Sequence, residues 1–235
     1  MSDSEVLDLL GAILPQIKIN NLPGKLITID SLDGSGGSTQ IDLLSKYLQS
    51  LGIQATQTKE PTSGDTTGDI IRGVLQDKPA FADLIEAFKR YPFDFQKLFT
   101  INRAGDLDNL ILPTLEFGMW LIADRYSPAT LAFGSSQKVA LWRLATIILD
   151  YPWPNLVLIL KVPVEECLVR IEERLKGTDG KKELFEKKET LERTWEAYEI
   201  IADRFPNTFI VDGTGTQKEV AARIREVVHS VLLNN

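Results

Sequence analysis

Apolar runs alternate with amphipathic stretches along this chain, and their order predicts the fold class. Short runs typical of strands buried on both faces lie at 25–30, 53–58, 119–123, 155–162 and 208–211. Helical spacing of apolar residues fills the intervals, at 40–51, 69–75, 80–90, 93–117, 139–150, 163–175, 184–205 and a last stretch that ends at 232. This alternation predicts an α/β protein, a three-layer α/β/α sandwich on a parallel sheet of five strands.

An amphipathic extension at residues 1–23 precedes this pattern, and one domain is expected over residues 24–235. Ser2 and Glu5 are spaced as a capping box, and the acidic start is unlike a signal peptide. The stripe fits a helix packed on the flank of the domain or, alternatively, a dimer contact. Its apolar residues share one helical face: Val6, Leu7, Leu10, Ile13, Leu14 and Ile17.

Composition excludes several classes of function. The chain has 26 basic and 33 acidic side chains and a net charge of −7, so neither nucleic acid nor a membrane is expected as a partner. Cys167 is the only cysteine, which rules out an intrachain disulfide and favours a cytoplasmic protein. Because His229 is the only histidine, a histidine-based metal site and a Ser-His triad both lack parts.

Candidate chemistry begins where the first strand runs into a glycine-rich turn at 31–38. Glycines let the backbone N–H groups of such a turn point inward, and the following helix presents its positive end to an anion. The phosphate-loop pattern G-x-x-x-x-G-K-[ST] matches at Gly36 and Ser38, but Ser31 and Gly37 stand where glycine and lysine belong. The turn therefore predicts a phosphate cradle, with a tight turn that binds no ligand as the alternative.

Five motifs, in order, resemble those of thymidylate kinases, the P-loop enzymes that phosphorylate dTMP. They are LDGSGGSTQ, TKEPTSGDTTGDIIRGVL, KLFTINRAGDLDNLILP, IADRYSPATLAFG and FEKKETLERTWEAY, and the resemblance spans residues 25–230. It implies a P-loop kinase fold, transfer of the ATP γ-phosphate to dTMP to give dTDP, Mg²⁺ as cofactor, a mobile lid near 175–190 and a homodimer. A deoxynucleoside kinase is the close alternative, which the motif Asp124-Arg125-Tyr126 disfavours.

The resemblance also implies roles on the donor side. Ser38 and Asp124 are the expected Mg²⁺ ligands, because a hydroxyl and a carboxylate suit a nucleotide-bound cation. Arg170 and Arg174 are expected to close over the ATP phosphates, and with Asp124 and Arg125 they form the expected catalytic set; a solvated helix face is the alternative for the first two. The expected ATP-binding residues are Gly34, Ser35, Gly36, Gly37, Ser38 and Thr39, with Asp212 and Gly213 near the adenine.

On the acceptor side, two arginines are expected to bind the phosphate of dTMP. Arg125 follows the third strand beside the turn, and Arg72 matches the arginine of a G-x-x-I-R motif. The alternatives are an ion pair of Arg125 with Asp124 or Glu60 and an exposed helix position for Arg72. The resemblance implies that Asp33 meets the sugar 3′-hydroxyl and that Glu60 is the acid of the E-P turn.

The base is expected to lie against the long helix. Phe99 and Arg103 are four residues apart and share a helix face, so that one can stack on a pyrimidine while the other donates to its carbonyl. Core packing is the alternative for Phe99. The resemblance adds Thr130 and Phe133 beside the base, with Gly134 where many relatives carry glutamine.

Departures from the family pattern concentrate at functional positions. Gly37 removes the lysine that bridges the donor phosphates, and Lys59, Lys161 and Lys181 are the candidates to supply its charge. Two hypotheses follow: a weakened kinase, or a pseudoenzyme that binds nucleotide without chemistry and serves as a partner subunit. For a weakened kinase, Gly37→Lys is expected to raise turnover by about tenfold or more.

Overall fold

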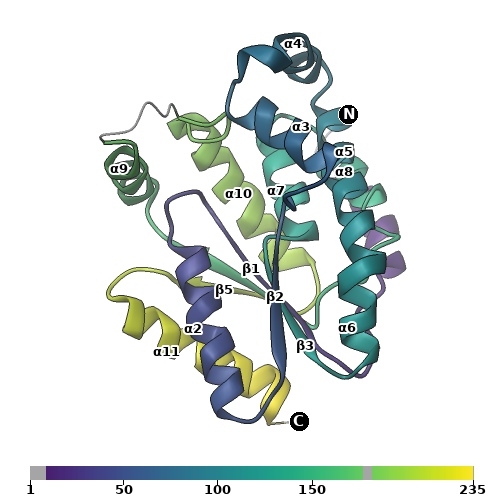
Figure 1. Ribbon diagram of the computed structural model, residues 1–235, viewed down its shortest axis with the longest axis vertical. Coiled ribbons are helices and arrows are strands. Elements are labelled where there is room, and N and C mark those ends of the chain that lie inside the picture. The colour runs from purple at the N-terminus through teal and green to yellow at the C-terminus, as the bar shows by residue number, and fades with distance from the viewer. Residues whose placement is uncertain (1–8, 177–181, 235) are drawn as a thin grey trace.

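The computed structural model describes residues 9–176 and 182–234, and it confirms the parallel sheet expected from the sequence (Figure 1). Its five strands lie in the order β2-β3-β1-β4-β5, and each neighbouring pair is parallel. The first strand is therefore central, and the turn that follows it emerges from the middle of the carboxyl edge. The strands are β1 (Leu26–Ser31), β2 (Ala55–Lys59), β3 (Trp120–Asp124), β4 (Leu156–Lys161) and β5 (Thr208–Asp212).

Helices cover both faces of the sheet and complete three layers (Figure 1). α2 (Gly37–Ser50) and α11 (Gln217–Val228) pack together on one face, where Leu44 and Ile224 join Ile27 and Leu158 in one buried cluster. On the other face α7 (Ser127–Ser136) packs against α10 (Lys188–Arg204). The remaining helices are α3 (Thr66–Leu75), α4 (Ala82–Arg90), α5 (Pro92–Asp106), α6 (Leu112–Glu116), α8 (Leu141–Thr146) and α9 (Val164–Leu175).

α7 is a helix that the hydrophobic pattern does not predict. Nine of its ten residues are buried, because α5, α8 and α10 all pack against it. A helix that is apolar on all sides has no polar stripe, so helical periodicity gives no signal. The next helix is shorter than predicted: the sequence indicated 139–150, whereas α8 spans only Leu141–Thr146.

Other helix boundaries also differ from the sequence expectation. The helix predicted at 93–117 contains a π-helical turn at Leu107–Ile111, where the N–H of Leu112 reaches back to the carbonyl of Leu107. Pro113, which has no N–H to donate, follows directly, so the irregularity lies where the normal ladder breaks. The helix predicted at 80–90 divides into a 3₁₀ turn at Pro79–Phe81 and α4, and the one predicted at 184–205 begins at Lys188.

The N-terminal segment packs on the domain. Residues 9–13 are helical and a 3₁₀ turn spans Leu14–Gln16, so the helix does not continue to residue 23 as the stripe suggested. Leu10 and Ile13 are buried in the core on the α7 side of the sheet. The capping box of Ser2 and Glu5, and residues 177–181 of the expected lid, lie outside the described residues. Within the described ranges, no helix is both long enough and apolar enough to cross a membrane.

Candidate active site

The candidate site lies at the carboxyl edge of the sheet, around the turn between β1 and α2. Gly34 and Gly36 have φ angles of 81° and 88°, which glycine adopts without the clash that a side chain would cause. α2 has no side-chain cap, so its first N–H groups remain available to an anion. A cavity of about 300 Å³ opens over the turn and is also lined by Asp33, Lys59, Arg72, Asp124, Arg125 and Arg174.

Ser31 and Gly37, the two departures from the phosphate-loop pattern, lie against each other. A Cβ atom added to Gly37 would stand 2.8 Å from the Ser31 Oγ, closer than side-chain carbons normally approach such an atom. Gly37 is the first residue of α2, and its φ angle lies outside the left-handed region. The Ser31 hydroxyl, and not the backbone angle, is therefore what would have to shift to admit a side chain at position 37.

The expected metal-binding pair meets at this edge. The Ser38 hydroxyl donates to Asp124 Oδ2 at 2.6 Å. Lys59, paired with Asp124 in the β2–β3 register, adds its ammonium at 2.9 Å from the same carboxylate oxygen and 3.3 Å from Ser38 Oγ. Hydroxyl and carboxylate oxygens suit Mg²⁺, a hard cation. Among the described residues, no group of three or more acidic, histidine or cysteine side chains could hold a metal alone.

Arg125 and Asp33, which also line the cavity, form an ion pair. Arg125 Nη2 donates to Asp33 Oδ1 at 2.5 Å, and the guanidinium stacks over Phe133 at 4.7 Å from the ring centroid. Although burial opposes the charge, Asp33 raises the pKa of Arg125, so the arginine stays cationic. Arg125 therefore pairs with Asp33, and not with Asp124 or Glu60, the two carboxylates considered from the sequence. Arg125 also has a φ angle of 72°, a strained conformation often found at functional sites.

Two further arginines line this cavity. Arg72 on α3 donates to the carbonyl of Pro61 and to the Ser63 hydroxyl, so it is tied to the turn after β2 rather than projecting freely from its helix. Arg174, at the end of α9, pairs with the buried carboxylate of Glu186 at 2.5 Å. Together with Arg125, these arginines give the cavity three guanidinium groups beside the glycine-rich turn at 31–38, named here the phosphate turn after its predicted role.

A second cavity of about 330 Å³ lies on the other side of the turn, between α2, α9 and the β5–α11 connection. Arg170 lines it and donates to the carbonyls of Gly34 and Ser35 at 3.3 and 3.2 Å. Gly213 also lines it, whereas Asp212 accepts from the backbone and hydroxyl of Thr214 within its own turn. Arg170 therefore contacts the turn, and it is not the purely solvated helix residue that the alternative described.

An apolar pocket of about 30 Å³ adjoins the main cavity. Phe99, Thr130 and Phe133 line it, as the resemblance implied. Gln96 and Phe185 line it as well, and sequence reasoning missed both. Gln96 lies one turn before Phe99 on α5, a spacing that could have revealed it. Since this volume suits about one water molecule, its aromatic walls must separate before a base can enter.

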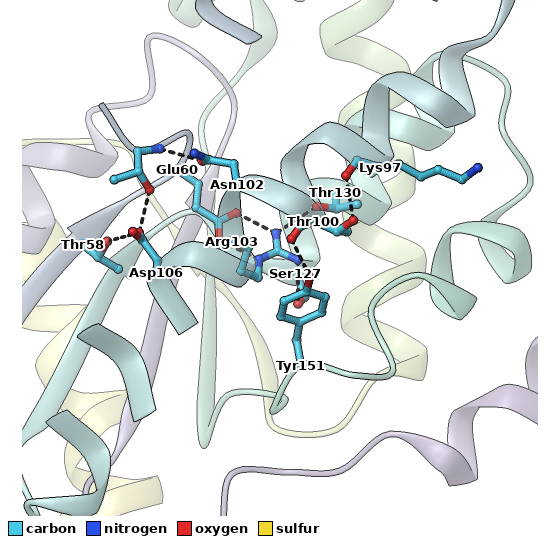
Figure 2. A network of polar contacts seen from close by, with 11 residues as sticks. Thr58, Glu60, Lys97, Thr100, Asn102, Arg103, Asp106, Ser127, Thr130 and Tyr151 are labelled. Atoms are coloured by element: carbon cyan, nitrogen blue, oxygen red, sulfur yellow. Dashed lines mark hydrogen bonds and ion pairs between the residues drawn. The ribbon is translucent and has the colours of Figure 1, made fainter. Parts of the chain in front are cut away.

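Arg103, expected to donate to the base, lies in the protein interior next to the pocket. It does not line the pocket: its guanidinium is fully buried and makes two 2.6 Å bonds to Glu60, with further contacts to the hydroxyls of Ser127 and Thr130 at 3.2 and 3.0 Å (Figure 2). Burial alone would lower the pKa of Arg103, but the Glu60 carboxylate raises it. Arg103 thus contacts the pocket through two of the residues that line it, Glu60 and Thr130.

A polar network holds the turn between β2 and α3. Asn102 accepts from the backbone N–H of Thr62 at 2.8 Å and donates to Asp65, whose carboxylate caps α3. Asp106 accepts from the hydroxyls of Thr62 and Thr58 at 2.6 and 3.2 Å (Figure 2). These partners come from the N-R-A-G-D run of α5, and sequence reasoning assigned a role there only to Arg103. The network fixes the segment that carries Glu60 and approaches Arg72.

Asp30 is a buried acid directly before the turn, and it predicts a pH dependence of stability. Both its carboxylate oxygens are buried and make no hydrogen bond of normal geometry. Burial raises the pKa of Asp30 to about 7, with the neighbouring Thr28 hydroxyl and the charge of Arg125 only partly opposing the shift. Because the folded state then holds a proton that the unfolded state has lost, Asp30 lowers stability progressively between about pH 4 and pH 7. The free energy of unfolding is expected to fall over that range.

Asp30→Asn is expected to remove this component. A shift of about three pKa units corresponds to a few kcal/mol, on the order of 4 at most, at pH 8. Chemical unfolding at pH 5 and pH 8 gives the measurement, and Asp42→Asn, at an exposed position of α2, is the matched control. If the Asp30 variant keeps the wild-type difference between the two pH values, the carboxylate does not titrate as described.

Comparisons with known proteins agree with the geometry. The family model described as thymidylate kinase matches residues 29–224. The chain is 34% identical over 192 residues to the thymidylate kinase of Alkalilimnicola ehrlichii, covering 78% of this chain and 82% of that protein. It is 32% identical to the thymidylate kinase of Pelobacter propionicus, with 90% and 97% covered, and 31% identical to a probable thymidylate kinase of Pyrococcus horikoshii, with 89% and 98% covered.

Proposed function

Because the chain belongs to the thymidylate kinase family, we propose that its site transfers the γ-phosphoryl group of ATP to dTMP, giving dTDP. One observation supports this most directly. A single cavity contains both the anion-binding turn before α2 and the arginines expected on the acceptor side, Arg72 and Arg125. In-line phosphoryl transfer needs donor and acceptor phosphates next to each other among fixed cations, and little covalent chemistry from the protein.

On the donor side, the backbone N–H groups of residues 34–39 bind the ATP phosphates. The adenine rests near Gly213, and Arg170 stabilises the carbonyl side of the turn. Mg²⁺, when bound, neutralises phosphate charge. Ser38 and Asp124 are the residues that would hold it, and their oxygens fit a cation that takes its other ligands from phosphate and water.

On the acceptor side, Arg125 and Arg72 bind the phosphate of dTMP and orient its oxygen toward the γ-phosphorus. Asp33, already held by Arg125, lies where the sugar 3′-hydroxyl can donate to it. The base enters between Phe99 and Phe133, with the Thr130 hydroxyl facing it. Arg103 and Glu60 position this wall from behind.

A turnover assay tests the proposal. The protein is incubated with ATP and Mg²⁺ and with each nucleoside monophosphate in turn, and ADP release is measured. We expect dTMP to have the highest kcat/KM. Binding of ATP and dTMP without turnover of any pyrimidine monophosphate would favour the pseudoenzyme hypothesis, to which the comparisons lend no support. Turnover of a deoxynucleoside in preference to dTMP would also contradict the proposal.

We also propose that the protein is a cytoplasmic homodimer whose partners are the two nucleotides. Ile101, Phe117 and Tyr91 expose 56%, 87% and 56% of their area along α5 and α6, more apolar surface than an isolated monomer needs there. Light scattering at micromolar concentration is expected to give the dimer mass, and a monomer mass would refute this.

A further inference from the structure

We propose that Lys59 is the catalytic cation that replaces the lysine missing from the phosphate turn, with its ammonium contacting the γ-phosphate during transfer. This inference rests on the proposed kinase function and names the residue that makes it feasible without a lysine at position 37. Losing one preorganised charge from such a site costs ~10² to 10³ in rate, so an active enzyme needs a substitute.

The phosphate turn cannot supply the charge itself. Gly37 has no side chain, and the Ser31 hydroxyl lies 2.8 Å from the place that its Cβ would take. A cation must therefore reach the phosphates from a neighbouring strand.

Lys59 is placed to do this. It ends β2 directly beside the end of β3, and its ammonium lies 3.3 Å from the Oγ of Ser38, the second residue of α2. An anion held by the first N–H groups of α2 therefore lies within reach of the same ammonium. The side chain remains 58% exposed, so it keeps the freedom to turn from Asp124 to a phosphate oxygen when Mg²⁺ takes the carboxylate.

Lys161, Arg125 and Arg174 each have an ionic partner other than Asp124. Lys161, the second candidate from sequence, pairs with Glu199 at 3.3 Å and lies over the ring of Trp195 at 5.0 Å. Arg125 is held by Asp33, and Arg174 by Glu186. Lys181, the third candidate, lies outside the described residues.

In the reaction, an oxygen of the dTMP phosphate forms a bond to the γ-phosphorus as the bond from that phosphorus to the β–γ bridging oxygen breaks. The electron pair leaves with ADP, and no oxidant or reductant is needed. Lys59 keeps its protons throughout and acts by charge and hydrogen bonding on the equatorial oxygens.

The test compares Lys59→Met with Lys59→Arg, using Lys161→Met as the matched control. Lys161 also ends a strand, is 54% exposed and pairs with a carboxylate. We expect Lys59→Met to lower kcat by about 10² or more, Lys59→Arg to retain most of it, and Lys161→Met to match the wild type. Without Mg²⁺, ATP should bind Lys59→Met about tenfold more weakly by calorimetry, the effect of losing one charge-assisted hydrogen bond.

The outcomes separate this inference from the proposed function. If the wild type turns over dTMP and Lys59→Met stays within about threefold of it, Lys59 is not the cation. An unchanged Mg²⁺-free ATP affinity with a shifted Mg²⁺ requirement would also overturn the inference, because Lys59 would then only position Asp124. If the wild type shows no turnover, the kinase proposal fails, and a weaker Mg²⁺-free affinity for ATP in Lys59→Met still identifies Lys59 as a phosphate contact.

Discussion

The combined change Ser31→Gly with Gly37→Lys is expected to raise turnover of dTMP by about tenfold or more, whereas Gly37→Lys alone gains less because the Ser31 hydroxyl must first turn aside. The sequence suggested that the single change suffices, but the Ser31 Oγ stands 2.8 Å from the Cβ that the new residue needs. Removing the hydroxyl first makes room, and the ammonium can then project back over the phosphates that the turn holds.

The decisive measurement places the same pair of changes in Lys59→Met. Restored turnover there would show that the two positions supply one interchangeable charge. Ser31→Gly alone is the control and is expected to leave kcat near the wild-type value, because it adds no cation. Equal gains from Gly37→Lys with and without Ser31→Gly would refute the steric coupling of the two positions.

Removing one partner of the Glu60–Arg103 pair is expected to destabilise the protein by about 3–5 kcal/mol. Both side chains are buried and joined by two 2.6 Å bonds, so Arg103→Met leaves a nearly buried carboxylate without its counter-charge. Urea unfolding monitored by tryptophan fluorescence gives the free energy. Lys89→Ala, which breaks the exposed pair with Glu86 on α4, is the control. We expect it to leave the free energy of unfolding unchanged within experimental error.

The double change Glu60→Leu with Arg103→Met is expected to recover much of this loss, since hydrophobic replacement of a complete buried pair is often nearly neutral. Its dTMP affinity should nevertheless stay low, because Thr130, which lines the pocket, loses the guanidinium that donates to its hydroxyl. A double variant that is less stable than both single variants would contradict the expectation that the complete pair can be replaced by apolar side chains at little cost.

The sequence predicted the layers and the phosphate turn because both depend on local patterns. β1 is a short apolar run, and the glycines that follow it need no tertiary information. α7 escaped prediction because burial on all sides removes periodicity. The helix face of Arg103 could be predicted from its spacing to Phe99, but its burial and its pairing with Glu60 could not. The sequence identified Lys59 as a candidate cation. Only the β2–β3 register shows that it lies beside Asp124, within reach of Ser38.

The central position of β1 has a consequence for how this enzyme can diversify. The β2–β3 side, from residue 55 to residue 136, supplies every residue that lines the apolar pocket except Phe185. The second cavity lies on the other side, between the β1–α2 turn, α9 and the turn before α11. The same continuous segment also carries Lys59 and Asp124, so its exchange between relatives would alter the proposed base pocket and the charges at the glycine-rich turn together, while the second cavity is inherited intact.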